Sequence, residues 1–213
     1  MQVRNNLQVI ELAGVNDASH LEELLELHAQ AFPEHSHVLA ELRENARIPR
    51  KREKCVVHQL LCVVDEIPAG FVVVHSNRER KVGLIHFLAV HPEFQGRLVA
   101  GTKVSTLLVE HAVELVALDL GASCAGVVAE SEPALLPCWA LWGFSPLPIT
   151  YSEPFHGMHW RDHEPLEFFD MTLVGYNMSA HSLIELGRKG ASAFLLDHYD
   201  VPPDHAVVQL AIG

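Results

Sequence analysis

A short loop of small residues lies between an apolar stretch and a long helical pattern. The loop, residues 95–101, reads QGRLVAG; the apolar stretch is residues 82–90, and the helical pattern is residues 102–120. Backbone N–H groups at the start of a helix have no partner within the helix, and the helix dipole favours negative charge there. Gly96 would let phosphate oxygens approach the backbone, and Arg97 would add a charge-assisted contact. The spacing therefore predicts an anion-binding loop.

A histidine-rich segment is the second group of residues that could do chemistry. Its ionisable residues are His156, His159, Asp162, His163 and Glu164. Imidazole and carboxylate groups suit zinc, but the spacing matches no strong zinc signature such as H-E-x-x-H. We therefore predict no metal site, while three interpretations of the segment stay open. They are a loop that lines a substrate pocket, a plain surface loop and a metal-binding loop.

Hydrophobic periodicity predicts the elements that must position these residues. The expected strands are residues 7–12, 56–64, 69–75, 82–90, 124–129, 145–151, 166–174 and 205–212. The expected helices are residues 18–32, 37–46, 102–120, 134–142 and 179–186. The three strands from residue 56 to residue 90 are joined by short polar turns and form an antiparallel meander. This mixed order predicts an α+β fold, with helices on both faces of a mixed, mostly antiparallel central sheet.

Composition limits the class of protein. The chain has 213 residues, of which 49% are hydrophobic and 20% charged, and its net charge is −12. Such a chain is long enough to bury a core without disulfides. Binding to nucleic acid depends on clustered Lys and Arg, so we expect no nucleic-acid partner. The acidic balance either steers a cationic amine to the protein or serves solubility alone.

Cysteine usage and hydropathy point to a cytoplasmic protein. Its cysteines, Cys55, Cys62, Cys124 and Cys138, form no C-x-x-C pair, and three of them lie in apolar runs. We therefore expect reduced thiols. No apolar run reaches the roughly 18 residues that span a bilayer, and the polar N-terminus lacks a signal peptide. We expect no membrane partner.

Two motifs resemble those of the GNAT superfamily of N-acetyltransferases. Residues 87–97, FLAVHPEFQGR, resemble the family's strand ending L-x-V-x-P followed by Q/R-x-x-G-x-G/A. Residues 139–144, WALWGF, resemble the Y-x-x-x-G-F ending of its last core helix. The resemblance covers about residues 7–175. It implies a GNAT-like acetyltransferase domain over residues 1–175, followed by a C-terminal extension over residues 176–213.

The resemblance implies acetyl-CoA as co-substrate, bound in an opening between the fourth and fifth core strands. The backbone of the fourth strand would bind the pantetheine arm as an added strand does. The loop would bind the pyrophosphate, and basic residues 47–54 would either contact the 3′-phosphate or form a solvated connection. The implied cofactor residues are Leu88, Ala89, Val90, Gln95, Gly96, Arg97, Leu98, Val99, Ala100, Gly101 and Trp139.

The implied reaction is direct attack of a primary amine on the acetyl thioester in a ternary complex. The acceptor class is a small-molecule amine or a peptide N-terminus. Resemblance also places the loop between the last two core strands at the edge of the acceptor site, so Phe155, His159 and Trp160 are predicted substrate residues. The extension is expected to add to the sheet or to contact the other copy in a homodimer.

The sequence departs from the family at three positions. Leu98 stands where the loop has its middle glycine, Trp139 where the family's tyrosine acid stands, and Glu132 where an asparagine is usual. An indole N–H donates a hydrogen bond but gives up no proton at useful pH. Either another group protonates the leaving thiolate, or the protein is a non-catalytic acyl-CoA-binding sensor or scaffold.

Candidates for the catalytic acid and base come from positions around the expected opening. Leu84 occupies the position of the family's fourth-strand carboxylate, and His86 lies two residues later on the same face. The imidazole of His86 would either act as general base or only pack and hydrogen-bond on the sheet face. Glu132 and Cys138 are the further catalytic candidates. Glu130, at the end of the fifth strand, would also face the opening.

Overall fold

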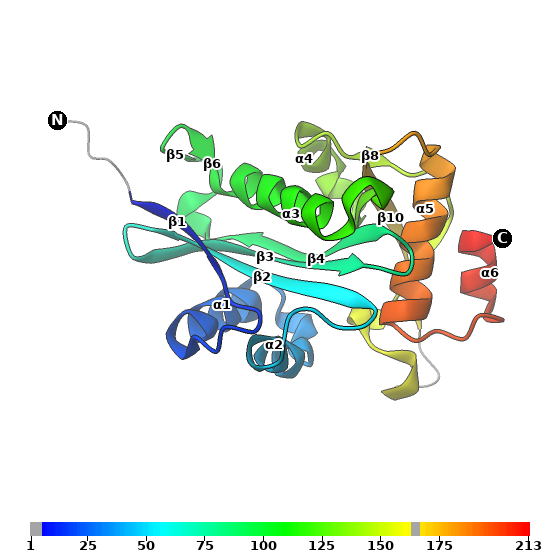
Figure 1. Cartoon of the computed structure of the whole chain (residues 1–213), viewed down its shortest axis with the longest axis horizontal. Coiled ribbons are helices and arrows are strands. Elements are labelled where there is room, and N and C mark those ends of the chain that lie inside the picture. Colours follow the sequence, from blue (N-terminus) through cyan, green and yellow to red (C-terminus); the bar gives the residue numbers. More distant parts are fainter. Residues whose placement is uncertain (1–5, 163–166) are drawn as a thin grey trace. The chain divides into compact units, whose positions relative to one another are not determined.

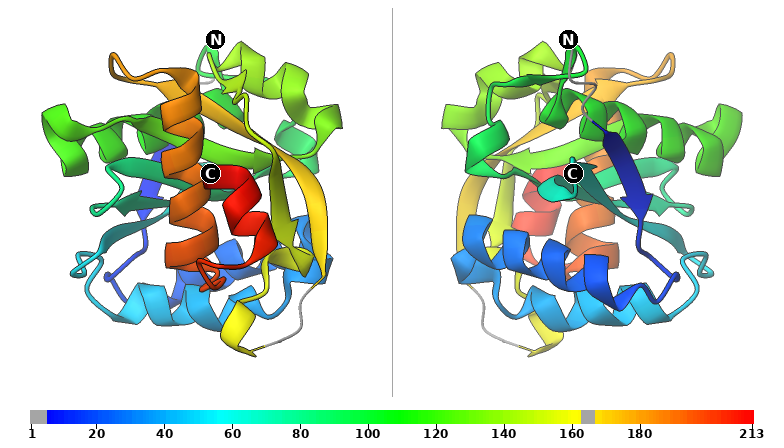
Figure 2. Two further views of the ribbon diagram at one scale, coloured as in Figure 1. Left: turned by 90° about the vertical axis from the view of Figure 1, so that its right-hand side faces the viewer. Right: turned by 90° about the vertical axis from the view of Figure 1, so that its left-hand side faces the viewer.

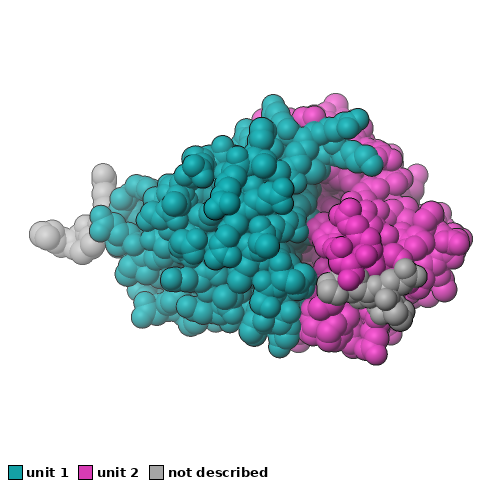
Figure 3. All heavy atoms as spheres, turned by 90° about the horizontal axis from the view of Figure 1, so that it is seen from below, with its two compact units in different colours: residues 1–75, 86–115 teal, residues 76–85, 116–213 magenta. Residues whose placement is uncertain are grey.

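The computed structural model describes residues 6–162 and 167–213 of the chain. The chain forms two compact units, coloured separately in Figure 3. Unit 1 comprises Met1–His75 and His86–Leu115, and unit 2 comprises Ser76–Ile85 and Val116–Gly213. Three elements, β3 (Ile67–Asn77), β4 (Val82–Val90) and α3 (Val104–Leu120), pass from one unit into the other.

Strands of unit 1 are covered on both faces by helices. β1 (Leu7–Glu11) pairs antiparallel with β2 (Cys55–Val64), and α1 (Ala18–Ala31) and α2 (Val38–Arg47) lie on the face opposite α3 (Figure 1). β2 is buried along nearly its whole length, and its sequence is apolar apart from the buried His58 and Gln59.

Helix α1 begins where the sequence predicted and ends before Pro33. The Asp17 carboxylate accepts a hydrogen bond from the N–H of His20 at 3.3 Å, which satisfies one of the unpaired N–H groups of the first turn. Leu24 and Leu25 of this helix pack into a core that also contains Phe71 of β3. The helix is therefore fixed at its start by a cap and along its length by burial.

A buried histidine interrupts this apolar core. The His28 ring is fully buried, with Phe87 at 4.7 Å and Phe32 at 5.4 Å between ring centroids. Neither ring nitrogen has a hydrogen-bond partner among the described residues. Burial, followed by the charges of His35 and His37, lowers the pKa of His28 to about 4. His28 is therefore a neutral aromatic filler of the core near neutral pH.

The sheet joins antiparallel ladders through one parallel pair of strands. Its strands follow the order β1-β2-β3-β4-β7-β10-β8, and β9 also pairs with β10. Within unit 2, β4 runs parallel to β7 (Gly126–Ser131), from Val82↔Gly126 to Ile85↔Ala129. β10 (Phe168–Asn177) is antiparallel to β7, β8 (Ser145–Pro146) and β9 (Tyr151–Pro154). The predicted mixed, mostly antiparallel α+β fold is confirmed.

Two predicted boundaries are corrected by the structure. Helix α3 begins at Val104 rather than at Thr102, because Thr102–Lys103 form the short strand β6. The strand expected over residues 145–151 is not continuous. Only its first two residues, in β8, and its last residue, which begins β9, are in strands. Both corrections lie where short strands end in turns, which periodicity locates poorly.

The C-terminal segment packs into the core of unit 2. Helix α5 (Leu183–Ser192) begins at a capping box formed by Ser182 and Glu185, continues as a π-helix over Ala193–His198, and lies beside α6 (Ala206–Ile212) (Figure 2). The predicted terminal strand over residues 205–212 is therefore wrong. This short apolar run buries Val208 and Ala211, which are spaced three residues apart, as a helix requires.

No helix within residues 6–162 and 167–213 is long and apolar enough to cross a membrane.

The helix between β7 and β8, α4 (Leu136–Leu141), is short and carries Trp139, the tryptophan of the predicted second motif.

We expect His28→Leu to reduce the acid sensitivity of the fold. The folded-state pKa of about 4 lies below the ordinary value of 6.5, so protonation favours unfolding as pH falls from 6.5 towards 4. The substitution changes the free energy of unfolding by some amount at each pH. We expect this change to be about 2 kcal/mol more favourable at pH 5 than at pH 8. Urea unfolding at both pH values measures this difference, with pH 8 as the internal control. Equal changes at pH 5 and pH 8 would contradict the buried, neutral imidazole.

Candidate functional site

The second half of β4 is more exposed than the first. Val82–Ile85 are buried, whereas His86–Val90 are half-buried. The N–H of His91 donates to the carbonyl oxygen of Ala69 at 2.9 Å, so β3 borders this part of β4. Because successive peptide groups of a strand alternate in direction, those of Leu88 and Val90 point to the opposite edge. That edge is suited to bind an extended ligand through backbone hydrogen bonds.

A glycine permits the close approach of β3 to β4. A Cβ atom at Gly70 would lie 2.7 Å from the carbonyl oxygen of Ala89 and 3.2 Å from the Cα atom of Val90. Only glycine fits this contact without a shift of the backbone. Of the three predicted pantetheine-binding residues, Ala89 therefore faces β3 through its backbone, and Leu88 and Val90 present theirs to the other edge.

The predicted anion-binding loop contains a small hairpin that the sequence analysis missed. Leu98–Val99 form β5, which pairs with β6 in the register Leu98↔Lys103 and Val99↔Thr102. The two residues between these strands, Ala100 and Gly101, have φ values of 50° and 91°. Positive φ at both positions is typical of a tight type I′ hairpin turn. Leu98 thus lies in a strand, where its Cβ causes no strain, and its side chain is 67% exposed.

Side-chain contacts order the start of this loop. The Nε2 group of Gln95 donates to the carbonyl oxygen of Val90 at 3.0 Å, and Nη1 of Arg97 donates to that of Glu93 at 3.0 Å. The guanidinium of Arg97 also lies 5.6 Å from the ring centroid of Phe94. Gly96, between them, has a φ of 72°, which suits glycine. Gln95 therefore ties the loop to the exposed end of β4, and Arg97 provides its positive charge.

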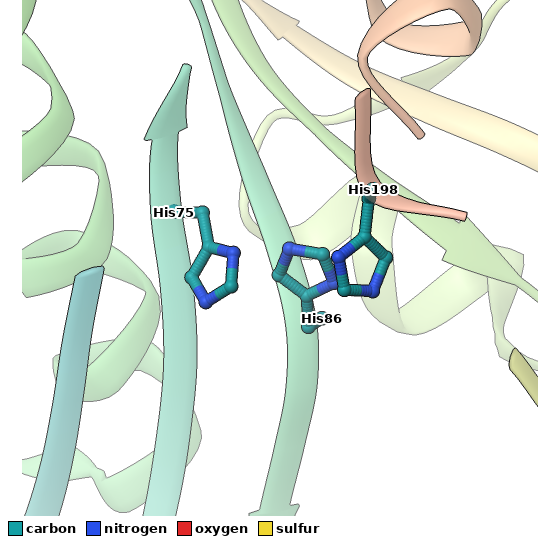
Figure 4. A group of neighbouring side chains, drawn as sticks. All are labelled: His75, His86 and His198. Atoms are coloured by element: carbon teal, nitrogen blue, oxygen red, sulfur yellow. The ribbon is translucent and has the colours of Figure 1, made fainter. Parts of the chain in front are cut away.

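Two imidazole rings lie together on β3 and β4. The ring centroids of His75 and His86 are 4.2 Å apart (Figure 4). Burial, with smaller contributions from the charges of Arg52 and His58, lowers the pKa of His75 to about 3. His75 is therefore neutral beside the predicted base His86. The third ring in Figure 4 is that of His198, which belongs to unit 2.

Unit 2 contains a carboxylate held by two phenols. The hydroxyl groups of Tyr151 and Tyr199 each donate to Glu130, and the Tyr199 hydroxyl lies 2.7 Å from Oε2. Burial raises the pKa of Glu130 to about 7, although both phenol hydrogen bonds act in the opposite direction. Burial also raises the pKa of both tyrosines well above 10, so both phenols are protonated donors near neutral pH.

A second carboxyl group adjoins this arrangement. Burial, followed by the negative charges of Glu130 and Glu132, raises the pKa of Glu153 on β9 to about 9. Two neighbouring carboxyl groups that both resist ionisation titrate as a coupled pair, so the pair does not carry two full negative charges near neutral pH.

The three hydrogen-bonded residues come from distant parts of the sequence. Glu130 lies on β7, Tyr151 begins β9, and Tyr199 directly follows the π-helix. The Tyr199 N–H donates to the carbonyl oxygen of Phe194 at 2.8 Å, an i−5 bond that closes the last π turn. Such turns occur mostly within α-helices and often at functional sites. Here the π turn directs the phenol of Tyr199 to Glu130.

The predicted substrate residues divide between two places in unit 2. The backbone N–H of Trp160 donates to the carbonyl oxygen of Tyr199 at 2.8 Å. The ring centroids of His159 and His198 are 5.1 Å apart. His159 and Trp160 therefore flank Tyr199. Phe155 instead packs on Phe169, with their centroids 5.3 Å apart.

The histidine segment is described only in part. Its residues His163 and Glu164 lie outside the described residues. In the described part of the chain, neither His156 nor His159 belongs to a group of three ligand atoms close enough for one metal ion.

Three further predicted residues differ in their exposure. Glu132 is exposed at the start of a short 3₁₀ turn, and Cys138 is exposed on α4. Trp139 is buried, with its ring 5.0 Å from Phe144 and 5.3 Å from Trp142. Trp139 therefore packs in an aromatic cluster.

Sequence reasoning missed Tyr199 and Glu153. Tyr199 lies outside the part of the chain that resembles the family core, and Glu153 stands in a short strand without a motif. The alternation of β9 was the available signal, because it places Tyr151 and Glu153 on one face.

Comparisons with known proteins identify the family. The model of the acetyltransferase (GNAT) family matches residues 21–144, which is more than half of the chain. None of the curated proteins matches the sequence.

Solved structures show the same fold at low sequence identity. Tetrahymena GCN5 has a TM-score of 0.51 at 11% identity, over 83% of this chain and 98% of that chain. An acetyltransferase from Streptococcus agalactiae has a TM-score of 0.55 at 13% identity, over 81% and 98% of the two chains. An acetyltransferase of the GNAT family from Staphylococcus aureus has a TM-score of 0.53 at 11% identity, over 82% and 100%.

The family match defines an acyltransferase class, and the chain belongs to the GNAT family of acetyltransferases. Members of this family use acetyl-CoA or CoA and act on amine substrates. The resemblance of the two motifs is thus confirmed at the level of the family.

We expect Glu130→Gln to change how stability depends on pH. The folded-state pKa of Glu130, about 7, lies above the ordinary value of 4.5. The stabilising contribution of its protonated form to the free energy of unfolding is therefore lost as pH rises from 4.5 through 7. Between pH 5 and pH 8, the variant should therefore lose less free energy of unfolding than the wild type, by at most about 3 kcal/mol. Urea unfolding at the two pH values measures the difference.

Glu185→Gln is the control for this experiment. Hydrogen bonds from Ser182 lower the pKa of Glu185, so this carboxylate is ionised at both pH values. Its replacement should shift stability equally at pH 5 and pH 8. An equal shift in the Glu130 variant would contradict the raised pKa.

Proposed function

We propose that this protein transfers the acetyl group of acetyl-CoA to a primary amine. The observation that carries the proposal is the half-buried segment His86–Val90 of β4, with the peptide groups of Leu88 and Val90 directed away from β3, followed directly by the Gln95–Gly101 loop. An extended acyl-pantetheine arm and a pyrophosphate follow each other in the same way along coenzyme A.

The pantetheine arm and the pyrophosphate each have matching groups in unit 1. Leu88 and Val90 offer backbone hydrogen bonds to the pantetheine amides. Gly96 and the turn at Ala100 and Gly101 offer backbone N–H groups to phosphate oxygens, and Arg97 offers a charge-assisted contact. A Cβ atom added at Gly96 or Gly101 would have no other atom within 4 Å, so ligand atoms can approach the backbone there.

The proposed chemistry is direct transfer without a covalent enzyme intermediate. The amine nitrogen attacks the thioester carbonyl carbon, and a backbone N–H near Val90 stabilises the oxyanion. The predicted role of His86 as base stays a prediction. The acidic surface, with a net charge of −12, favours the approach of cationic acceptors such as a small amine or a peptide N-terminus.

A second function, binding of acyl-CoA without catalysis, has one observation in its favour. Trp139 replaces the family's tyrosine acid and is buried against Phe144, so it supplies no proton to a leaving thiolate. A sensor or scaffold of the same fold would keep the cofactor loop and turn over no amine.

Calorimetric titration with acetyl-CoA tests the cofactor site. We expect micromolar binding by the wild type and at least tenfold weaker binding, about 1.4 kcal/mol, by Gln95→Ala/Arg97→Ala. The matched control is Gln30→Ala/Arg43→Ala, which removes the same residue types from α1 and α2, where Gln30 is exposed and Arg43 is half-buried. The control should bind as the wild type does.

Absence of acetyl-CoA binding in the wild type would contradict the proposal. If binding is confirmed, release of the coenzyme A thiol is followed with a panel of polyamines, amino acids, aminoglycosides and peptide N-termini. Release with at least one amine supports transfer. Tight binding without release for any of them would favour the sensor.

A further inference from the structure

We propose that the ion pair of Glu11 and His58 sets the lower pH limit of the proposed acetyl transfer by keeping His86 uncharged. The effect passes through the imidazole of His75. This inference rests on the proposed function, in which His86 is the predicted base, and it concerns residues of unit 1 alone. Glu11 and His58 are positioning residues in this role, because they act on His86 through another side chain.

Neighbouring strands each contribute one ionisable residue to a row across the sheet of unit 1. The row follows the order in which the strands pair: Glu11 ends β1, His58 lies on β2, His75 on β3 and His86 on β4. His58 is fully buried and His75 is buried, whereas Glu11 and His86 are half-buried. The polar groups of the row are therefore largely removed from water, and each needs a polar partner.

Hydrogen-bond donors hold the carboxylate of Glu11 in place. Its Oε1 atom accepts from the backbone N–H groups of Ala13 at 3.0 Å and Gln59 at 2.9 Å. Its Oε2 atom lies 2.6 Å from Nδ1 of His58 and 3.5 Å from Nη1 of Arg50. Backbone amides and guanidinium groups only donate, so Glu11 is the acceptor, and Nδ1 of His58 carries the hydrogen.

The short contact to Glu11 favours a charged imidazole at His58. A hydrogen bond between an imidazolium and a carboxylate is shorter and stronger than one between neutral groups. A buried charge is costly unless it is paired and hydrogen-bonded, and the carboxylate meets both conditions. A positive charge on His58 is therefore stable beside Glu11.

The second nitrogen of His58 is directed away from Glu11. The two nitrogens of an imidazole point to different sides of the ring, so when Nδ1 faces β1, Nε2 faces β3, the other neighbour of β2. His75 is the imidazole of β3 that the charge of His58 reaches. Burial, followed by the charges of Arg52 and His58, lowers the pKa of His75 to about 3, so this ring stays neutral.

His75 connects the ion pair to β4. The ring centroids of His75 and His86 are 4.2 Å apart, and the ring planes are inclined by 54° (Figure 4). A proton on His86 would place a second positive charge one ring away from that of His58, and like charges disfavour each other. His86 therefore favours the neutral form, in which an imidazole is able to accept a proton.

Other titratable groups around the row come from the loop before β2 and from the segment that runs from α1 to α2. They are Arg50, Arg52, His28, His35 and His37. The helical group meets β4 at Phe87, whose ring centroid lies 4.7 Å from that of His28. All of these groups are the same in every variant of the test, so they do not contribute to the differences.

The pH profile of kcat/KM on the full chain, with the best acceptor of the amine panel, tests the row. His58→Gln removes the positive charge and leaves Glu11 negative, so the acidic limb should move to higher pH by roughly half a unit or more. Glu11→Gln should move it in the same direction but less. A buried imidazole without its carboxylate becomes neutral, so this variant loses both charges of the pair. The dissociation constant for acetyl-CoA should stay within about twofold in both variants.

His20→Gln is the matched control. His20 also pairs with a carboxylate, that of Asp17 at 2.7 Å, but this pair lies at the start of α1, where 35% and 34% of the two side chains are exposed. Solvent screens such a pair, so its loss should leave the acidic limb in place. Circular dichroism on each variant checks that it is folded.

Long-range ¹H–¹⁵N spectra of the protein with ¹⁵N-labelled histidine test the charges without any activity measurement. At pH 7 we expect both ring nitrogens of His58 to be protonated, whereas His75 and His86 should each have one protonated nitrogen. Each signal is assigned by its loss when that histidine is replaced by glutamine.

The outcomes separate this inference from the proposed function. A wild type that acetylates no amine overturns both, because there is then no activity whose pH limit the row could set. In an active wild type, a neutral His58 at pH 7 or an unmoved limb in His58→Gln overturns the inference alone. A limb that moves equally in His20→Gln also overturns it. Support requires a charged His58 with neutral His75 and His86. It also requires a limb that moves most in His58→Gln, less in Glu11→Gln and not in His20→Gln.

Discussion

The parallel pairing of β4 with β7 is the constraint on which the rest of the structure depends. Parallel neighbours cannot be joined by a tight turn, so the chain must cross over through a helix, here α3. The crossing is close, because a Cβ at Gly83 would lie 2.5 Å from a methyl group of Val116. The same connection contains the Gln95–Gly101 loop, which lies between the end of β4 and the start of α3.

The polar residues of unit 2 show how a buried charge is tolerated. A carboxylate removed from water is costly unless it is hydrogen-bonded. Two phenols supply those bonds to Glu130, and they in turn are held by β9 and by the segment after the π-helix. The neighbouring Glu153 also resists ionisation, so the pair avoids a second full charge. A site that stabilises one negative charge and not two is able to exchange a single proton reversibly.

Much of the fold was predictable, since it depends on local patterns. The cap at Asp17, the apolar run of β2 and the motif around Val90 each reflect neighbours within a few residues. The hydrogen bonds to Glu130 join residues 21 and 69 positions apart, and no local pattern encodes such a meeting. The terminal run AVVQLAI illustrates a different failure, because its seven residues favour a strand by length, whereas the burial of Val208 and Ala211 follows a helix.

The π-helix over Ala193–His198 has an evolutionary consequence. A π turn contains one residue more than an α turn, so this segment holds one residue more than a regular α-helix would hold there. Deleting one residue there would restore a regular helix and rotate the following side chain by about 100°, away from its partner. In an alignment of relatives, a gap of one position in this helix would therefore mark chains that lack the tyrosine–glutamate contact, even where every other residue is kept.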